Sequence, residues 1–210
     1  MFTDTKVQNI FEHYEARAYE EKERMGKLGF SGRDQFLLPI GPEVGRFLHS
    51  LILAHQPKRI LEIGTSYGYS TLFLADAART VGGKLITLEL VDYKQDYAKD
   101  KISEAGLESS VDFILGDAVD SINSDLGPFD FVLLDIWKEL YVPCFEAVYP
   151  KLSKEAIIAA DNMYFPQGSM EHTRLYRKVV NDKADLQTVL LSIGAGIELT
   201  HRWSEDSEKL

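Results

Sequence analysis

The sequence predicts an α/β fold in which a doubly wound, mostly parallel sheet of seven strands ends in an antiparallel hairpin. Five short apolar runs are each followed by a stretch with helical periodicity, and strands that alternate with helices at this spacing form parallel sheets. Two further apolar runs lie on either side of the glycine-rich residues 193–196, a signal typical of a hairpin. We therefore expect a single domain over residues 1–210, whose 45% hydrophobic content suits one large core.

The N-terminal part is expected to be helical. Residues 4–28 carry apolar side chains at a loose helical spacing. A proline, Pro39 or Pro42, then opens a second helix from Glu43 to Ala54 with one apolar side. We expect the helices within residues 1–55 to cover the functional site, and their apolar character suggests a homodimer.

The strands and helices of the sheet region follow in strict alternation. Parallel strands are expected at residues 59–63, 84–90, 111–115, 130–134 and 155–160, and hairpin strands at 185–192 and 196–203. Helices are expected at residues 69–79, 92–105, 117–124, 138–149 and 171–182. The acidic tail, residues 204–210, is expected to be frayed.

Composition limits the classes of partner. A formal net charge of -10 and a pI near 5.0 argue against nucleic acid, because binding to it relies on Lys and Arg at the phosphates. The single Cys144 excludes an internal disulfide and suits a reducing compartment. We find neither a secretory signal nor a run of ~18 apolar residues, so we expect a cytoplasmic protein with no membrane partner.

A glycine turn follows the first strand of the sheet. Gly64 and Gly68 allow the backbone to turn tightly and to approach a ligand closely. The spacing E-x-G-x-x-x-G differs from the dinucleotide pattern G-x-G-x-x-G, and it suits a nucleoside that carries a carboxylate better than a pyrophosphate. Ser70, near the start of the next helix, could bind that carboxylate through its hydroxyl and backbone N–H.

Two further strand ends carry residues suited to the same nucleoside. Glu89 ends the second strand, where a carboxylate can accept hydrogen bonds from both ribose hydroxyls. Asp117 and Ala118 follow the third strand, beside the expected position of an adenine. A glycine turn alone is more often structural, but three such signals at successive strand ends indicate a nucleoside site.

The same turn also matches the motif of a different enzyme class. Residues 64–68 spell the G-x-S-x-G nucleophile elbow, and the chain order Ser66, Asp161, His201 is that of a hydrolase triad. An elbow normally follows an earlier strand that supplies an oxyanion loop, whereas this turn follows the first strand. The glutamates at the ends of the first two strands would also have no role. A serine hydrolase is therefore kept only as an alternative.

Two later strand ends predict a metal site. Asp135 ends the fourth strand, and Asp161 with Asn162 ends the fifth. Because the carboxyl ends of adjacent central strands face the ligand crevice, these oxygens should converge there. Two carboxylates and an amide suit Mg²⁺ or a similar hard cation, such as Mn²⁺ or Ca²⁺. The alternative is that these residues only cap the strand and the following helix.

Lys138 lies three residues beyond Asp135, within reach of the same crevice. Burial and a nearby cation would both push a lysine toward its neutral form, and a neutral amine can accept a proton from a hydroxyl group. The alternative is a solvated lysine on the first turn of a helix, with Trp137 as a core or lid residue.

Three segments together resemble a known enzyme family. They are residues 61–70 (Leu-Glu-Ile-Gly-Thr-Ser-Tyr-Gly-Tyr-Ser), 134–141 (Leu-Asp-Ile-Trp-Lys-Glu-Leu-Tyr) and 160–162 (Ala-Asp-Asn). The chain is similar to the cation-dependent O-methyltransferases that use S-adenosylmethionine, the group of the catechol and caffeoyl-CoA enzymes, from about Leu37 to Arg202. The resemblance implies the class I methyltransferase fold, a Rossmann-like seven-stranded sheet whose last strand is antiparallel.

The resemblance also implies a role for each matching position. Lys138 would take the phenolic proton as the catalytic base, and Asp135, Asp161 and Asn162 would bind the cation. Phe36, Lys138 and Pro166 would contact the substrate. The implied cofactor-binding residues are Leu38, Ile40, Glu62, Gly64, Ser66, Tyr69, Ser70, Glu89, Leu90, Asp117, Ala118, Asp135 and Trp137.

The acceptor implied by the resemblance is a catechol-like or other phenolic small molecule. The sequence departs from the catechol type at Ile136, Val189 and Ala195, so a flavonoid or hydroxycinnamoyl acceptor fits as well as catechol. Some bacterial members of the group methylate hydroxyuridine in tRNA, which is the alternative acceptor. A local basic strip could bind the tRNA, although glutamates are interspersed with its residues. The strip consists of Arg17, Lys22, Arg24, Lys27 and Arg33.

Overall fold

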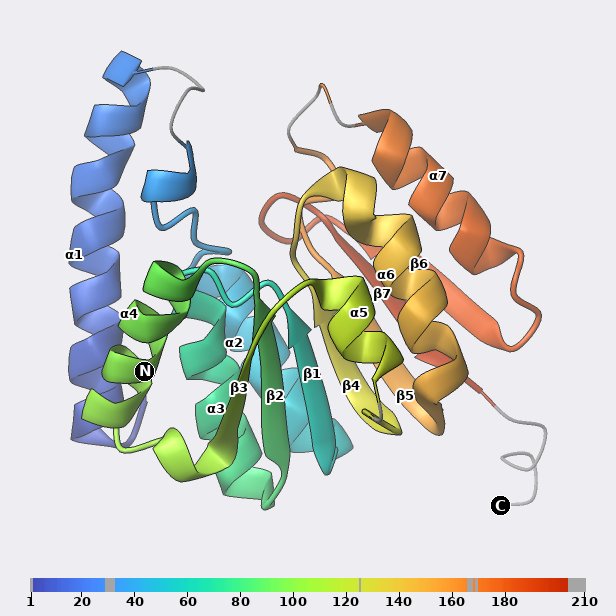
Figure 1. The fold of residues 1–210 in the computed structure, drawn as a ribbon, viewed down its shortest axis with the longest axis horizontal. Helices are drawn as coiled ribbons and strands as arrows, with labels where there is room; N and C mark the ends of the chain where they lie inside the picture. Colours follow the sequence, from blue (N-terminus) through green and yellow to red (C-terminus); the bar gives the residue numbers. More distant parts are fainter. Residues whose placement is uncertain (1, 29–32, 125, 166–167, 169, 204–210) are drawn as a thin grey trace.

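Seven strands form one sheet that separates two layers of helices (Figure 1). The computed structural model describes residues 2–28, 33–124, 126–165, 168 and 170–203. The strand order is β3-β2-β1-β4-β5-β7-β6, in which β7 runs antiparallel to both of its neighbours and the other pairs are parallel. This arrangement confirms the predicted fold class. The strands are β1 (Arg59–Ile63), β2 (Lys84–Glu89), β3 (Val111–Leu115), β4 (Phe129–Leu134), β5 (Leu152–Ala160), β6 (Leu186–Leu191) and β7 (Ile197–Arg202).

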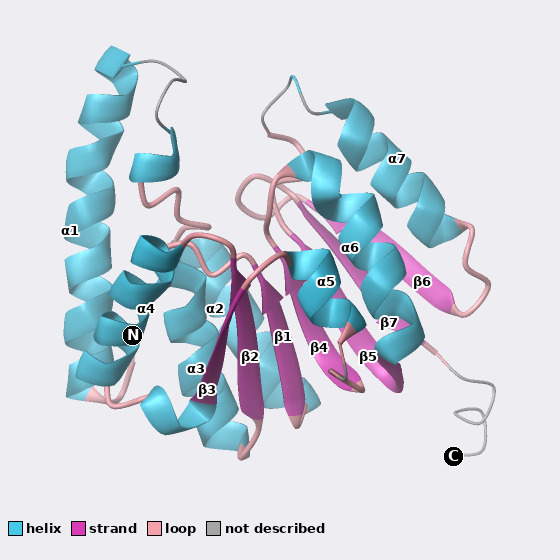
Figure 2. Cartoon of the chain, viewed as in Figure 1, coloured by secondary structure: helices cyan, strands magenta, loops and turns pink. Residues whose placement is uncertain are grey.

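The helices divide between the two faces of the sheet (Figure 2). One face is covered by α1 (Thr5–Leu28), α2 (Pro42–His55), α3 (Tyr69–Val81) and α4 (Asp92–Glu104). The other face is covered by α5 (Ala118–Asn123), α6 (Tyr141–Val148) and α7 (Met170–Asn181). Short 3-10 turns complete the chain: η1 (Arg33–Gln35), η2 (Glu108–Ser110), η3 (Lys138–Leu140) and η4 (Tyr149–Lys151).

The alternation of side chains along each strand builds two separate cores. On β1, Ile60 packs under α3 while Leu61 faces the α5–α6 layer, because successive strand residues point to opposite faces. Both side chains are fully buried. Each such side chain contributes about 1.5–3 kcal/mol relative to an exposed position. The central strands are therefore held in register from both sides, which fixes where their carboxyl ends lie.

The structure corrects two predicted boundaries. The helix expected at residues 138–149 is divided into η3, α6 and η4. Pro143 lies in the first turn of α6 and Pro150 in the first turn of η4, where a missing N–H is tolerated. Strand β5 begins at Leu152 rather than at residue 155, since Leu152 pairs with Phe129 of β4 despite the polar residues that follow it. The tail at 204–210 lies outside the described residues.

The apolar side of α1, which led us to expect a homodimer, is used inside the chain. Val7, Ile10, Phe11 and Tyr14 are buried in the core shared with α3. The homodimer therefore stays a prediction without that support. Within the described residues, no helix is long and apolar enough to cross a bilayer.

Candidate active site

The predicted site residues gather at the carboxyl ends of four neighbouring strands. Strand β1 pairs with β2 on one side and β4 on the other, and β4 pairs with β5. The loops after these strands therefore lie side by side at one edge of the sheet, the position where doubly wound folds hold their ligands.

The glycine turn after β1 is pinned between its two neighbours. The backbone N–H groups of Gly64 and Thr65 both donate to the carbonyl of Leu88 on β2, at 3.1 and 3.0 Å. Gly64 has a φ of 105°, and a Cβ at this position would overlap the carbonyl oxygen of Asp135. Only glycine can be accommodated here, because both the backbone conformation and the close approach exclude a side chain.

Glu62 lies directly beneath this turn and is completely buried. The hydroxyls of Ser70, Thr71 and Thr87 donate to its carboxylate at 2.5–2.6 Å. Burial raises the pKa of Glu62 to about 7, although these three hydrogen bonds act in the opposite direction. The Ser70 hydroxyl is thus engaged with Glu62, whereas its backbone N–H lies in the first turn of α3, where N–H groups have no intrahelical partner.

Glu89, at the end of β2, organises the backbone around it. One carboxylate oxygen accepts the N–H of Ser66 at 2.7 Å, and the other accepts the N–H groups of Leu90 and Val91 at 2.9 and 3.0 Å. The oxygen bound to Ser66 keeps a further lone pair for a ligand hydroxyl, whereas the oxygen bound to Leu90 and Val91 already accepts two N–H groups. Glu89 therefore holds the turn after β1 and remains able to accept hydrogen bonds.

The residues expected around an adenine follow β2, β3 and β4. Leu90 is 68% exposed and Trp137 is 46% exposed. Asp117 caps α5, where its side chain accepts the N–H of Asp120, and Ala118 is buried beneath it. The exposed pair Leu90 and Trp137 could cover an apolar ring, whereas Ala118 belongs mainly to the core.

The two carboxylates and the amide come together at the ends of β4 and β5. Asn162 donates from Nδ2 to Asp161 Oδ2 at 2.8 Å and to Asp135 Oδ1 at 3.4 Å. Asn162 adopts a φ of 57°, a left-handed conformation that asparagine tolerates better than most residues. The other oxygen of Asp161, Oδ1, is buried and has no hydrogen-bond partner among the described residues.

Lys138 is buried under the same cluster. Its ammonium group donates to the carbonyl oxygen of Asp161 at 3.1 Å and to the hydroxyl of Tyr141. Tyr141 in turn donates to the carbonyl of Asp161 at 2.7 Å and is itself completely buried. The lysine is therefore a packed and oriented side chain, not a solvated one.

Burial controls the charges of this cluster. It raises the pKa of Asp161 to about 7, and the negative charge of Asp135 adds to that rise. It also raises the pKa of Asp135, against the effect of Lys138, and it lowers the pKa of Lys138, against the effect of both carboxylates. When both carboxylates are ionised, the cluster carries an excess of negative charge that its one amine cannot balance.

That excess fits a cation. The unpartnered Oδ1 of Asp161, with the carboxylate of Asp135 and the amide oxygen that Asn162 would present after rotation of its side chain, forms an all-oxygen set suited to Mg²⁺. No group of three His, Cys, Asp or Glu side chains that could hold a metal occurs in the described part of the chain. The donor set thus fits a hard cation that also keeps water or ligand oxygens.

The remaining predicted residues lie at different depths. Phe36 and Ile40 are buried, and Leu38 is 42% exposed with a φ of 45°. Tyr69 is buried and donates its hydroxyl to Glu15 on α1, so it faces the helical layer. Pro166, expected at the acceptor, lies outside the described residues.

The structure does not assemble the hydrolase triad. His201 on β7 pairs with Ile157, which precedes Asp161 by four positions on the neighbouring strand. At ~3.3 Å per residue this separates the two by roughly 13 Å along the sheet. Ser66 instead uses its backbone N–H to bind Glu89.

Several residues that hold the site were not predicted to do so from the sequence, and Arg17 was considered only as part of a basic strip. Tyr141 is the last residue of the matching segment 134–141, but no role was predicted for it. Tyr14 and Arg17 lie on α1, where Tyr14 donates to the carbonyl of Tyr67 at 2.7 Å and Arg17 stacks on the Tyr67 ring at 4.0 Å. No local motif marks these contacts, because they join segments about 50 residues apart.

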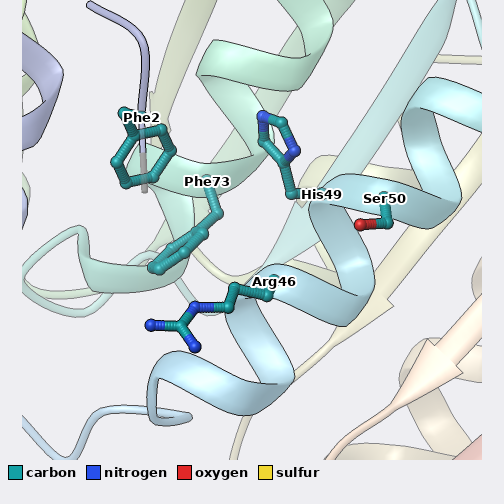
Figure 3. A pocket seen from close by; sticks show the side chains of 5 residues that line it. All are labelled: Phe2, Arg46, His49, Ser50 and Phe73. Atoms are coloured by element: carbon teal, nitrogen blue, oxygen red, sulfur yellow. The ribbon is translucent and has the colours of Figure 1, made fainter.

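A cavity of about 260 Å³ lies elsewhere, on the outer side of α2 and α3 (Figure 3). The Arg46 guanidinium extends away from the His49 ring (Figure 3), and His49 Nε2 is hydrogen-bonded to Asp76 at 2.9 Å. These groups do not converge on a common point, so the candidate site remains the one at the strand ends. The lining residues are Phe2, Arg46, His49, Ser50 and Phe73.

Comparisons with known proteins show the family and the fold of this chain. A family model of O-methyltransferases matches residues 32–203. A catechol O-methyltransferase of Niastella koreensis is 35% identical over 130 residues, which are 60% of this chain and 58% of that protein. The chain thus spans little more than half the length of that relative.

Solved structures share the fold. The cofactor-bound structure of Rv0187 from MTB superposes with a TM-score of 0.74 at 27% identity, covering 79% of this chain and 82% of that one. An O-methyltransferase from Bacillus cereus in complex with SAH superposes with a TM-score of 0.75 at 22% identity, covering 96% and 92%.

Proposed function

The chain belongs to the O-methyltransferase family, and we propose that it transfers a methyl group from S-adenosylmethionine to a hydroxyl group of a catechol-like or other phenolic small molecule, with the help of a divalent cation. The observation that carries this proposal is the convergence of Asp135, Asp161 and Asn162 with a buried Lys138, next to a glycine turn and Glu89. A binding protein would not need an oriented, desolvated amine at this position.

The methyl donor is assigned to the turn after β1. The N–H groups at the start of α3 suit its carboxylate, Glu89 suits its ribose hydroxyls, and Leu90 with Trp137 suits its adenine. Glu62 acts from below, because it holds the hydroxyls of Ser70, Thr71 and Thr87 and so fixes the turn.

The cation is assigned to Asp135, Asp161 and Asn162. When bound, a divalent cation lowers the pKa of a coordinated hydroxyl group and orients it. Lys138 lies within the same cluster, and we assign to it the removal of the hydroxyl proton. Tyr141 holds the lysine amine in place. The negatively charged oxygen is then directed toward the sulfonium, so the chain contributes mainly position and exclusion of water.

The tRNA alternative has less support from the described residues. Arg17, the first member of the basic strip, is engaged with Glu21 at 2.7 Å and with the rings of Tyr67 and Tyr97. The side chains of Lys27 and Arg33 lie outside the described residues. A small phenolic acceptor therefore remains the proposal, together with cytoplasmic location and a homodimer as predictions.

A panel of catechols, hydroxycinnamoyl compounds and simple phenols, incubated with labelled S-adenosylmethionine, tests the proposal. We expect methylation of vicinal diols that stops with EDTA and returns with Mg²⁺. Transfer that is unaffected by EDTA would contradict the assigned cation. A gel-shift titration with tRNA at ~150 mM salt serves as the second arm, and tight binding there would favour the alternative acceptor.

A further inference from the structure

The segment between η1 and α2 runs from the glycine turn after β1 to the tip of the β6–β7 hairpin. At one end, the hydroxyl of Tyr67 in the glycine turn donates to the carbonyl of Asp34 at 3.2 Å. At the other end, the carbonyl oxygen of Ile40 lies against the tip of the β6–β7 hairpin, 3.8 Å from the position of a Cβ at Gly194. In Figure 1 this segment lies beyond the ends of β1 and β2. Residues 34–40 therefore form one wall of the site.

Leu38 is the unusual residue of this wall. Its φ of 45° is left-handed, a conformation that side chains with a Cβ rarely adopt. Its side chain is 42% exposed, although its neighbours Leu37 and Ile40 are 1% and 9% exposed. A residue with such a strained backbone keeps its conformation only because its surroundings hold it.

The contact that holds this segment comes from α1. Glu21 is buried at 7% exposure and accepts the backbone N–H of Leu37 at 2.6 Å. Its other oxygen accepts Nε of Arg17 at 2.7 Å, and Arg17 stacks on the ring of Tyr67. A charge-assisted hydrogen bond on the residue just before Leu38 is strong enough to oppose relaxation of a strained backbone. The same helix thus anchors both the glycine turn and the wall.

We propose that Glu21 is a positioning residue: its carboxylate, bound to the N–H of Leu37, holds Leu38 in the left-handed conformation and so places the apolar wall of the methyl-donor site. The inference rests on the proposed function, because it takes the wall to face bound S-adenosylmethionine. A sulfonium offers no hydrogen-bond donor, so an apolar wall positions it by shape and excludes water. Without Glu21, Leu38 relaxes to a negative φ and the wall moves.

The first test measures thermal unfolding of the ligand-free protein, so it does not depend on activity. The variants are Glu21→Ala, Leu38→Gly and the double variant, with Glu20→Ala as the matched control because Glu20 is exposed on the same helix. We expect Glu21→Ala to lower Tm by about 5 °C or more, and Glu20→Ala to leave it nearly unchanged.

The combination of the two variants decides the mechanism. Glycine adopts a left-handed backbone without strain, so Leu38→Gly relieves strain only where Glu21 still imposes it. We therefore expect the Tm change caused by Leu38→Gly to be more favourable in the wild-type background than in the Glu21→Ala background. The entropy that glycine adds to the unfolded chain is the same in both backgrounds and cancels. Strictly additive Tm changes would overturn the proposal.

The second test separates positioning from binding. We expect Glu21→Ala to lower kcat at least ~10-fold while the Kd for S-adenosylhomocysteine, measured by calorimetry, stays within ~3-fold, because Tyr14 still anchors the turn. Glu21→Gln keeps an oxygen for the N–H of Leu37 and should restore kcat. Equal kcat in Glu21→Ala and Glu20→Ala would refute the positioning role. Failure of the wild type to bind S-adenosylhomocysteine would refute the proposed function instead, and the Tm comparison would still test Glu21.

Discussion

The α-carbon of Gly64 lies directly against the backbone carbonyl of Asp135, so that a Cβ on Gly64 would overlap this oxygen. The ends of β1 and β4 thus meet at a point where no side chain fits. This contact makes the proposed donor turn and the proposed cation site share a border, so that the proposed methyl donor and acceptor hydroxyl would lie close together.

Gly64→Ala should therefore be strongly destabilising. The new methyl group must displace the Asp135 backbone and adopt a φ of 105°, and we expect a loss of more than about 3 kcal/mol in the free energy of unfolding. Gly82→Ala is the matched control, because Gly82 also has a positive φ but its Cβ would meet nothing closer than 4.0 Å. Denaturant titrations measure the free energy of unfolding of both variants. If Gly64→Ala and Gly82→Ala lost similar amounts, the contact with Asp135 would be unimportant.

Lys138→Ala should abolish turnover without loss of the donor site. Removal of a general base typically costs ~10²–10⁴-fold in rate. The donor site rests on Glu62 and Glu89, which Lys138 does not touch, so the Kd for S-adenosylhomocysteine should be unchanged. Lys178→Ala, at a position that is 70% exposed on α7, is the control. Normal turnover of Lys138→Ala would remove this lysine as the base.

Glu89→Ala should weaken cofactor binding. The variant loses the acceptor proposed for the ribose hydroxyls and frees the N–H groups of Ser66, Leu90 and Val91. Loss of hydrogen bonds to a charged group corresponds to roughly a tenfold or larger rise in Kd. Calorimetry with S-adenosylhomocysteine measures it, with Glu108→Ala, an exposed position in η2, as the control. An unaltered Kd would contradict the ribose role.

Glu62→Gln should change how stability depends on pH. The pKa of Glu62 is about 7 in the folded chain and 4.5 in the unfolded one, so the folded state keeps a proton that the unfolded state has lost between these values. The contribution of Glu62 to stability is therefore greatest below pH 4.5 and declines as the pH rises to 7. We expect the stability of the wild type relative to Glu62→Gln to fall by about 2–3 kcal/mol from pH 5 to pH 8.

Urea titrations at several pH values measure this difference. Other groups with a raised pKa, such as Asp161, are present in both proteins and largely cancel in the comparison. A pH-independent difference between the two proteins would mean that Glu62 ionises normally despite its burial.

Local patterns predicted the fold because they recur within each element. The apolar run at 59–63 and the glycines at 64 and 68 define β1 and the start of α3 from neighbouring residues alone, and the structure confirms both. The same holds for Asp135, Asp161 and Asn162, since residues that follow parallel strands in adjacent positions must lie at one edge of the sheet.

Contacts between distant segments could not be predicted in this way. Nothing near Glu21 indicates that it binds the N–H of Leu37, and nothing near Lys138 indicates that it is buried under Tyr141 and the carbonyl of Asp161. Ser70 is a clear example, because its position suggested a ligand contact whereas its hydroxyl is bound to Glu62.

The sequence by itself determined which elements form, in what order, and which polar residues end the strands, because hydrophobic periodicity and glycine spacing are local properties. Only the tertiary structure decided the burial of Glu62 and Lys138, the strained backbone of Leu38 and the anchoring of the site by α1. These features depend on which distant side chains exclude water from a buried polar group and which hydrogen-bond partners it then finds. Both are decided by the packing of segments that lie far apart in the sequence.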